Sequence, residues 1–242
     1  MKGVENQGIG SFPAQDLTVT DETKNKLQLA IDAVDSTIRN RKTRKVLRVT
    51  PGPVQLSAEA IANRDEQVSE SIGVAGWAPF HYDRKRNECA EPWRFTLFFH
   101  QACQRLSDRF FELFTDIKPT NKIPRMLQAC GALVLVSWIP ENDAAPEKIN
   151  QVNEEHLAAA SAATQNLMLA LEVRGLGSYW SSGGVLGSPP FFAEHGMAPD
   201  EKLIAAVFVH YPGLYSDDTL EIIEGKNRQK RSASEKWTRI ID

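Results

Sequence analysis

The chain has 242 residues, of which 42% are apolar and 24% are charged, and its formal net charge is −3. This balance is that of an ordinary soluble protein with a sizeable core, and the slight acidic excess argues against a general nucleic-acid binder, which would carry a basic surplus. Cys89, Cys103 and Cys130 are odd in number and widely spaced. They do not suggest a disulfide framework, so a reducing compartment fits best.

The first 25 residues are polar and contain no apolar run of seven or more, which argues against a typical secretory signal. No stretch of 18 apolar residues occurs in the chain, so the sequence offers no membrane span. We expect a cytoplasmic protein in which residues 1–25 form a polar N-terminal arm. Residues 26–242 would form a single domain, because no linker divides the chain after residue 50.

Two helices are predicted in the N-terminal third. Apolar residues recur in steps of four, three and four over residues 23–42, which places them on one helical face: Leu27, Ile31, Val34 and Ile38. The Pro-Gly-Pro sequence at 51–53 then interrupts the chain. Ser57 is a good N-cap for a second helix, which would end near Ala75.

Three apolar segments are typical of strands, the last two of strands buried on both faces: residues 93–100, 132–139 and 203–210. Between the first two, apolar residues over 106–114 repeat at helical spacing. The longest helix is predicted from about 151 to 174, ended by Gly175. Helices and strands do not alternate as they do in a doubly wound sheet, so an α+β domain is the better interpretation.

Six basic residues crowd positions 39–48, and two interpretations stay open for them: Arg39, Arg41, Lys42, Arg44, Lys45 and Arg48. The first is a solvated helix end, where cations complement the helix dipole. The second is an anion site, because guanidinium, ammonium and the Thr43 hydroxyl all suit a phosphate. A second basic cluster covers residues 226–231, and by itself it is typical of an exposed tail. The two clusters gain meaning only if the fold brings them to one phosphate.

Other chemistries find little support. The five histidines are scattered, without HExxH or a neighbouring cysteine at metal spacing, so no metal site is predicted. Gly175-Leu176-Gly177 begins like a dinucleotide fingerprint, but Trp180 stands where the third glycine belongs, and the segment ends a helix instead of opening one. The chain also lacks a GxSxG elbow and a P-loop.

Five segments stand out in chain order: Arg41-Lys42-Thr43-Arg44-Lys45; Ala78-Pro79; Pro92-Trp93-Arg94-Phe95; residues 163–170 followed by Gly175-Leu176-Gly177; and Lys230-Arg231 with Glu235. Over about 200 residues they resemble the nitroreductase-like flavoprotein family. The first is similar to its RRSxR phosphate motif, the third to QPWrF, the fourth to QNLxLAA…GLG and the fifth to the basic tail KRrPLeE. The fourth is the most specific, and it diagnoses the fold more than the chemistry.

The resemblance implies a nitroreductase-like α/β/α sandwich with a mostly antiparallel central sheet, formed as an intertwined homodimer with FMN in the interface. Twelve residues would contact the cofactor: Arg41, Lys42, Thr43, Lys45, Pro79, Phe80, Trp180, Ser181, Ser182, Arg228, Lys230 and Arg231. The basic residues and Thr43 would surround the phosphate, and Trp180 to Ser182 would lie near the isoalloxazine. Pro79 and its neighbours would approach the flavin from the other subunit.

The resemblance also implies an FMN-dependent oxidoreductase. NADH or NADPH would reduce nitroaromatic, quinone or similar planar acceptors by a ping-pong mechanism, with the hydride chemistry carried by flavin N5 and no catalytic acid or base required. The main alternative is a flavin-binding protein for storage, sensing or regulation with little turnover. A protein that consumes FMN by fragmentation and a basic-arm interaction protein without flavin also stay open. The polar segment 81–90 is an insertion relative to the family and could reshape the pocket mouth or close over the flavin.

Overall fold

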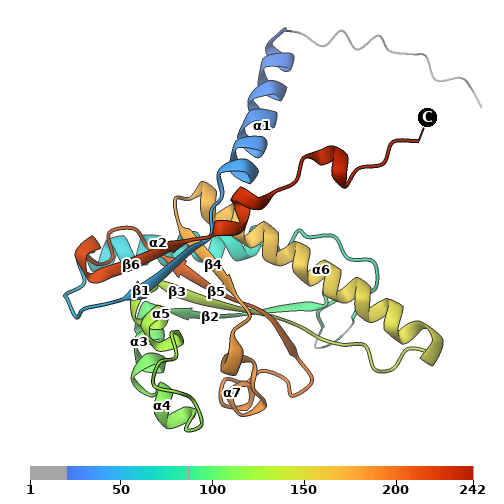
Figure 1. Ribbon diagram of the computed structural model, residues 1–242. Coiled ribbons are helices and arrows are strands. Elements are labelled where there is room, and N and C mark those ends of the chain that lie inside the picture. The colour runs from blue at the N-terminus through green and yellow to red at the C-terminus, as the bar shows by residue number, and fades with distance from the viewer. Residues whose placement is uncertain (1–20, 85, 87, 242) are drawn as a thin grey trace, which may run out of the picture. The chain divides into compact units, whose positions relative to one another are not determined.

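A computed structural model describes residues 21–84, 86 and 88–241 (Figure 1). The chain divides into two compact units, one ending at Arg39 and the other beginning at Asn40. The first unit contributes the helix α1, Asp21–Asn40, whose first turn is acidic and none of whose residues is buried. The last five residues of the predicted arm are therefore helical, and the rest of the arm lies outside the described residues.

A four-stranded sheet forms the centre of the second unit, with the order β2-β3-β5-β4 and every pair antiparallel. Its strands are β2 (Trp93–Phe99), β3 (Ala132–Trp138), β4 (Gly177–Ser181) and β5 (Lys202–His210). The three strands predicted from the sequence are thus confirmed to within a residue. The prediction missed β4, which forms one edge of the sheet.

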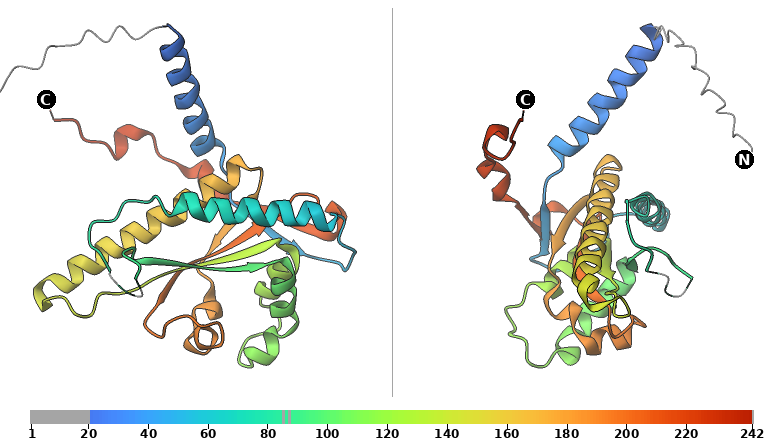
Figure 2. Two further views of the ribbon diagram at one scale, coloured as in Figure 1. Left: turned by 180° about the vertical axis from the view of Figure 1, so that it is seen from behind. Right: turned by 90° about the vertical axis from the view of Figure 1, so that its right-hand side faces the viewer.

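The central strands have an apolar core on each face, because consecutive side chains of a strand point to opposite sides. Leu133 and Leu135 lie in one core, while Val134 and Val136 lie in the other. The second core is covered by α2 (Ala58–Ala75) and α6 (Pro146–Val173), which cross the same face of the sheet (Figure 2). The first core is covered by α3 (His100–Asp108), α5 (Ile123–Ala129) and α7 (Pro189–Glu194), with the short α4 (Phe110–Leu113) beside them. This is the expected α+β sandwich of helices on both faces of an antiparallel sheet.

The helix boundaries follow local sequence signals. Ser57 caps α2 through its side chain, which accepts a hydrogen bond of 3.2 Å from the backbone N–H of Ala60. The long helix α6 begins five residues earlier than predicted, at Pro146, because proline is favoured in the first turn. Gly175 ends it at φ +72°, a conformation that favours glycine. The helix expected over residues 106–114 is instead two helices, α3 and α4, separated at Arg109.

The second half of the basic segment near the N-terminus forms a strand, so its interpretation as a helix end holds only for Arg39, in the last turn of α1. The helix α1 ends at Asn40, and β1 (Arg44–Arg48) pairs antiparallel with β6 (Leu220–Glu224) in a separate two-stranded sheet. Two buried residues in β1, Val46 and Leu47, hold it on the rest of the unit. The pairing brings residues 41–43 beside the tail that follows β6 (Figure 1).

Candidate functional site

A cavity of about 600 Å³ lies where the two basic clusters meet. Three segments line it: residues 41–43 before β1, the edge strand β4, and the chain after β6. The lining residues are Arg41, Lys42, Thr43, Tyr179, Trp180, Glu224, Gly225, Lys226, Asn227, Arg228, Gln229 and Arg231. The basic segments at 39–48 and 226–231 therefore belong to one site.

Backbone contacts hold the three segments together. Thr43 forms a parallel β-bridge with Ser178, and its carbonyl accepts a hydrogen bond of 3.1 Å from the N–H of Gly225. A Cβ on Gly225 would lie only 3.0 Å from the Thr43 Cβ, so glycine allows this close approach. Arg228 then reaches back and donates a hydrogen bond of 2.8 Å from Nη1 to the carbonyl of Arg41. Residues about 185 positions apart in the sequence are thus fixed at one place.

The cavity has an excess of positive charge. Five lining residues are cations, against the single carboxylate of Glu224, which lies 3.6 Å from the Lys42 ammonium. Burial lowers the pKa of Arg41; the nearby positive charges of Arg228 and Arg231 lower it further, and Glu172 opposes them. A bound anion would relieve this repulsion, and forked guanidinium donors suit a phosphate.

Tyr179 and Trp180, neighbouring residues of the edge strand β4, both line the same cavity, and we call them its aromatic wall. Their side chains pack against the cores on opposite faces of the sheet. The indole of Trp180 is fixed by a hydrogen bond of 3.1 Å from Nε1 to the carbonyl of Ile204. The ring of Tyr179 stacks on Phe208, with 6.4 Å between centroids, and the Lys45 ammonium lies 5.2 Å from the same ring. A basic region beside an aromatic wall suits a ligand with a phosphate at one end and a planar ring at the other.

Six of the twelve residues predicted for the site line this cavity: Arg41, Lys42, Thr43, Trp180, Arg228 and Arg231. Among the others, Lys45 lies outside the lining but contacts the Tyr179 ring. Burial, assisted by the nearby Lys122, lowers the pKa of its ammonium. Lys230 belongs to the same short helical segment as Arg228, but it is not a lining residue.

The remaining predicted residues are not among those that line the cavity within one chain. Ser181 and Ser182 follow the aromatic wall, and the Ser181 hydroxyl accepts a hydrogen bond of 3.2 Å from the N–H of Gly183. Pro79 and Phe80 follow α2, and the Phe80 ring makes an edge contact of 5.7 Å with Trp93. Trp93 belongs to a core cluster formed with residues 159–163 of α6.

The sequence prediction missed several lining residues, in particular Tyr179, Gly225, Asn227 and Gln229. Tyr179 immediately precedes the predicted Trp180, but neighbouring side chains of a strand point to opposite faces, so its place in the lining had no local signal in the sequence. Gly225 stands before the second basic cluster, where a glycine typically marks a change of direction. Asn227 and Gln229 had no such signal.

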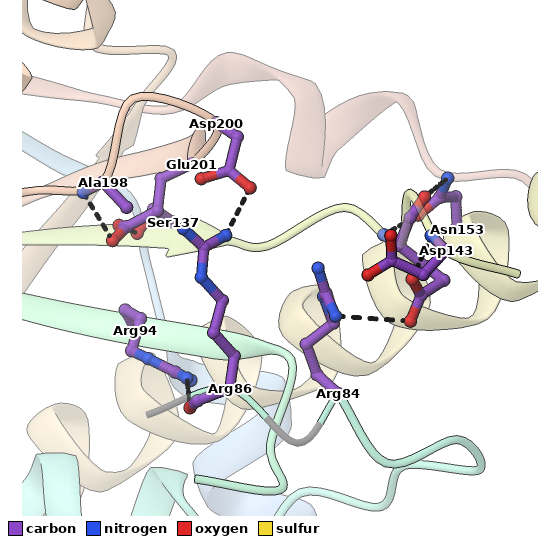
Figure 3. A network of polar contacts seen from close by, with 10 residues as sticks. Arg84, Arg86, Arg94, Ser137, Asp143, Asn153, Ala198, Asp200 and Glu201 are labelled. Carbon is purple, nitrogen blue, oxygen red and sulfur yellow. Dashed lines mark hydrogen bonds and ion pairs between the residues drawn. The ribbon is translucent and has the colours of Figure 1, made fainter. Parts of the chain in front are cut away.

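The described residues of the inserted segment are anchored by polar contacts (Figure 3). Arg84 forms an ion pair of 3.3 Å with Glu141, and their side chains are only 9% and 15% exposed. Arg86 forms an ion pair with Asp200, and its carbonyl accepts a hydrogen bond of 3.0 Å from Arg94. These contacts tie the segment to β2, to the loop after β3 and to the loop before β5. Arg84 and Arg86 therefore connect the described part of the segment to the rest of the domain.

Metal binding and membrane crossing receive no support from the described residues. Among residues 21–241 apart from 85 and 87, no three histidine, cysteine, aspartate or glutamate side chains are grouped as a metal ion requires. None of the helices in the described part of the chain combines the length and the apolar run that crossing a membrane demands.

Comparison with solved structures identifies relatives of the same fold. The nitroreductase-like family protein from Bacillus cereus is 22% identical, with a TM-score of 0.57 over 86% of this chain and 96% of that one. The FMN-dependent nitroreductase NfnB from Mycobacterium smegmatis, solved in complex with NADPH, is 14% identical, with a TM-score of 0.53 over 88% and 100%. A BluB-like flavoprotein from Clostridium difficile 630 is 19% identical, with a TM-score of 0.52 over 86% and 99%.

No sequence among the curated proteins matches the chain significantly. The family model described as "Nitroreductase family" matches residues 64–209, more than half of the chain. That range contains the four strands of the central sheet, without the last residue of β5. It also contains α6 and all of α2 except its first turns, the two long helices that cover one face of the sheet. The chain belongs to the Nitroreductase family.

Proposed function

We propose that the chain is an FMN-dependent oxidoreductase that uses NADH or NADPH to reduce nitroaromatics, quinones or similar conjugated acceptors by a ping-pong mechanism. One observation carries this proposal: three arginines, Arg41, Arg228 and Arg231, line one cavity beside the aromatic wall of β4. Membership of the Nitroreductase family supports the same function. So does the likeness to NfnB, which is described as FMN-dependent and was solved with NADPH.

The residues present fit FMN at its phosphate end. A phosphate monoester carries about two negative charges at neutral pH, and a group of guanidiniums compensates them. Arg41 is half-buried, whereas Arg228 and Arg231 are exposed in the single chain. Arg41, Arg228 and Arg231 would donate to the phosphate, and the Thr43 hydroxyl lies among them. Lys42 would contribute mainly charge, since its ammonium already lies 3.6 Å from Glu224.

The protein's contribution to the reaction would be position and electrostatics. FMN, when bound, supplies the hydride acceptance and donation at N5. Trp180, fixed through its indole N–H, would orient the planar ring, and the backbone and hydroxyls of Ser181 and Ser182 would lie near its polar edge. The arginines would favour negative charge on the bound ligand. None of these roles requires a side chain that transfers a proton.

An intertwined homodimer is part of the proposal. Trp77, beside Ala78-Pro79, is 89% exposed, and three apolar residues of the C-terminal tail are 73% to 87% exposed: Trp237, Ile240 and Ile241. Contact with another chain would remove these large apolar side chains from water. A second copy that covers them would also bring its Pro79 and Phe80 to the flavin. Sedimentation equilibrium tests the association, and a monomer at all concentrations would remove this part of the proposal.

The decisive experiment is anaerobic stopped-flow mixing of FMN-loaded protein with NADH and then with NADPH, followed at the oxidised flavin band. Rapid bleaching by either nucleotide would establish the reductase and identify its donor. A flavin that keeps its oxidised spectrum for minutes with both would contradict nicotinamide-driven turnover. In that case a flavin-binding protein for storage or sensing would be the better explanation of the same cavity.

A further inference from the structure

A second cavity, of about 390 Å³, lies at the opposite end of β1 from the site described above. Its lining residues are Arg48, Val49, Thr50, Pro51, Gly52, Gln104, Arg125, Gln128 and Tyr215. It shares no lining residue with the first cavity. Thr43 and Arg48 are five residues apart along an extended segment, which corresponds to about 16 Å at about 3.3 Å per residue.

Arg48 is a buried and pre-oriented cation in this cavity. The residue is only 8% exposed. Its Nη1 donates a hydrogen bond of 2.9 Å to the Thr219 hydroxyl, and its Nη2 donates one of 2.6 Å to the carbonyl of Gly52. The flat guanidinium lies over the Tyr215 ring, with 3.6 Å between Cζ and the ring centroid. These contacts fix the guanidinium in one orientation before any ligand binds.

The contacts of Arg48 leave its charge uncompensated. Both of its hydrogen-bond acceptors are neutral, and none of the ion pairs among the described residues includes it. A ring face attracts a cation but does not neutralise it. Because a charge removed from water is costly unless it is paired, a buried arginine of this kind favours an anion beside it.

A second guanidinium lines the same cavity from α5. Arg125 donates a hydrogen bond of 2.8 Å from Nε to the carbonyl of Arg48, which holds it next to that residue. Its Nη2 lies 3.3 Å from the carboxylate of Glu221, which is not a lining residue. The two arginines are the only charged residues among those that line the cavity, so its described lining is positive. The side-chain amide of Gln128 offers a further donor.

We propose that this cavity binds a small oxyanion of the phosphate or carboxylate type. Guanidinium groups present forked pairs of donors that match the oxygens of both groups. The volume exceeds that of a bare phosphate and lies near the lower end of the usual range for small-molecule sites, about 300 to 1,000 Å³. The anionic group would therefore belong to a small metabolite, whose remainder lies along Val49 and Pro51. This site is independent of the flavin proposal.

Isothermal titration calorimetry with inorganic phosphate and with succinate tests the site. The FMN-loaded protein is titrated at constant ionic strength kept with NaCl, so that screening does not change during the titration. We expect saturable binding of at least one of the two anions, with one site per chain. Arg125→Gln should weaken it about tenfold or more, because hydrogen bonds to charged groups are among the stronger ones. Arg125→Lys keeps the charge but loses the fork, so its effect should be smaller.

Arg109→Gln is the matched control, since Arg109 also pairs with one carboxylate, Glu194 at 3.2 Å, and lines a different cavity. Saturable binding that Arg125→Gln weakens and Arg109→Gln leaves unchanged supports the site. Absence of saturable heat with both anions, or equal affinity in wild type and Arg125→Gln, overturns it. The titration is repeated in an Arg41→Ala, Arg231→Ala background. Binding that persists there and is still weakened by Arg125→Gln comes from the second cavity, because Arg125 does not line the flavin cavity. Binding in that background that Arg125→Gln leaves unchanged overturns the site, so the test is decided whether or not the chain binds FMN.

Discussion

Replacing Arg41 and Arg231 by alanine should release FMN while leaving the domain folded. Both residues line the basic cavity, and Arg41 is partly buried. Burial, together with the charges of Arg228 and Arg231, lowers the pKa of the Arg41 guanidinium, which indicates that these cations repel one another when no anion is present. Their removal should therefore cost ligand affinity without costing stability.

The expected loss follows from the strength of charge-assisted hydrogen bonds. Each such bond contributes about 1.5 to 3 kcal/mol, so each single variant should raise the Kd for FMN about 10-fold to 150-fold. The double variant should lose about 3 to 6 kcal/mol, which corresponds to a Kd raised about 150-fold to 20,000-fold if the two contributions add. A protein that binds FMN at nanomolar concentration would then be purified largely without it.

Flavin absorbance of the purified protein and quenching of FMN fluorescence on titration measure this loss. Arg39→Ala is the matched control, because Arg39 belongs to the same basic segment but pairs with Asp35 within its own helix at 3.2 Å. Thermal unfolding of the flavin-free proteins should give the double variant a Tm equal to that of wild type or higher. A double variant that keeps its full flavin content at wild-type affinity would refute the phosphate assignment.

Three further predictions concern stability. In a urea titration, Gly131→Ala should lower the free energy of unfolding by at least about 2 kcal/mol, because the new Cβ would lie 2.1 Å from the fully buried Tyr211 ring. Gly73→Ala is the control: its Cβ would have no neighbour within 4 Å, so the variant should be neutral or stabilising. Arg84→Ala should cost about 3 kcal/mol, since it leaves a carboxylate buried without its partner (Figure 3), and a loss below 1 kcal/mol would contradict this. Burial lowers the pKa of His210 to about 4 from an ordinary value of 6.5. The unfolded chain therefore takes up a proton that the folded chain does not, and stability should fall by about 3 kcal/mol as the pH falls from 6.5 to 4. In the same measurement on His210→Gln, the fall in stability should be smaller by about this amount, while the contribution of His156, whose pKa burial also lowers, remains.

The parts of the fold that the sequence predicted are those whose signal is local. Strands β2, β3 and β5 are apolar along their whole length, and the Ser57 cap and Gly175 mark the ends of helices directly. The strand β1 carries mostly basic residues and owes its conformation to β6, whose nearest paired residue is more than 170 positions away. A strand that forms through pairing with such a distant segment cannot be predicted from the spacing of neighbouring residues. The edge strand β4 has only five residues, too few to show a period.

The same distinction applies to the candidate site. Arg41, Lys42 and Thr43 could be predicted because the resemblance gave a short motif its meaning. Lys45 belongs to the same motif, but an extended chain advances about 3.3 Å per residue, which carries it about 7 Å beyond Thr43. Its ammonium then lies over the Tyr179 ring instead of among the lining residues. Residue spacing alone does not show which members of a motif face the ligand.

The placement of Pro79 and Phe80 links the flavin proposal to the dimer proposal. One chain supplies the basic end of the cavity and one aromatic wall, whereas Phe80 packs on Trp93, in the core cluster that involves α6. Within one chain these two residues are not among those that line the cavity at Arg41. In an intertwined dimer they would contact the ligand of the partner while the fold of each chain stayed as described. The assignment of Pro79 and Phe80 therefore depends on dimerisation, whereas that of Arg41, Arg228 and Arg231 does not.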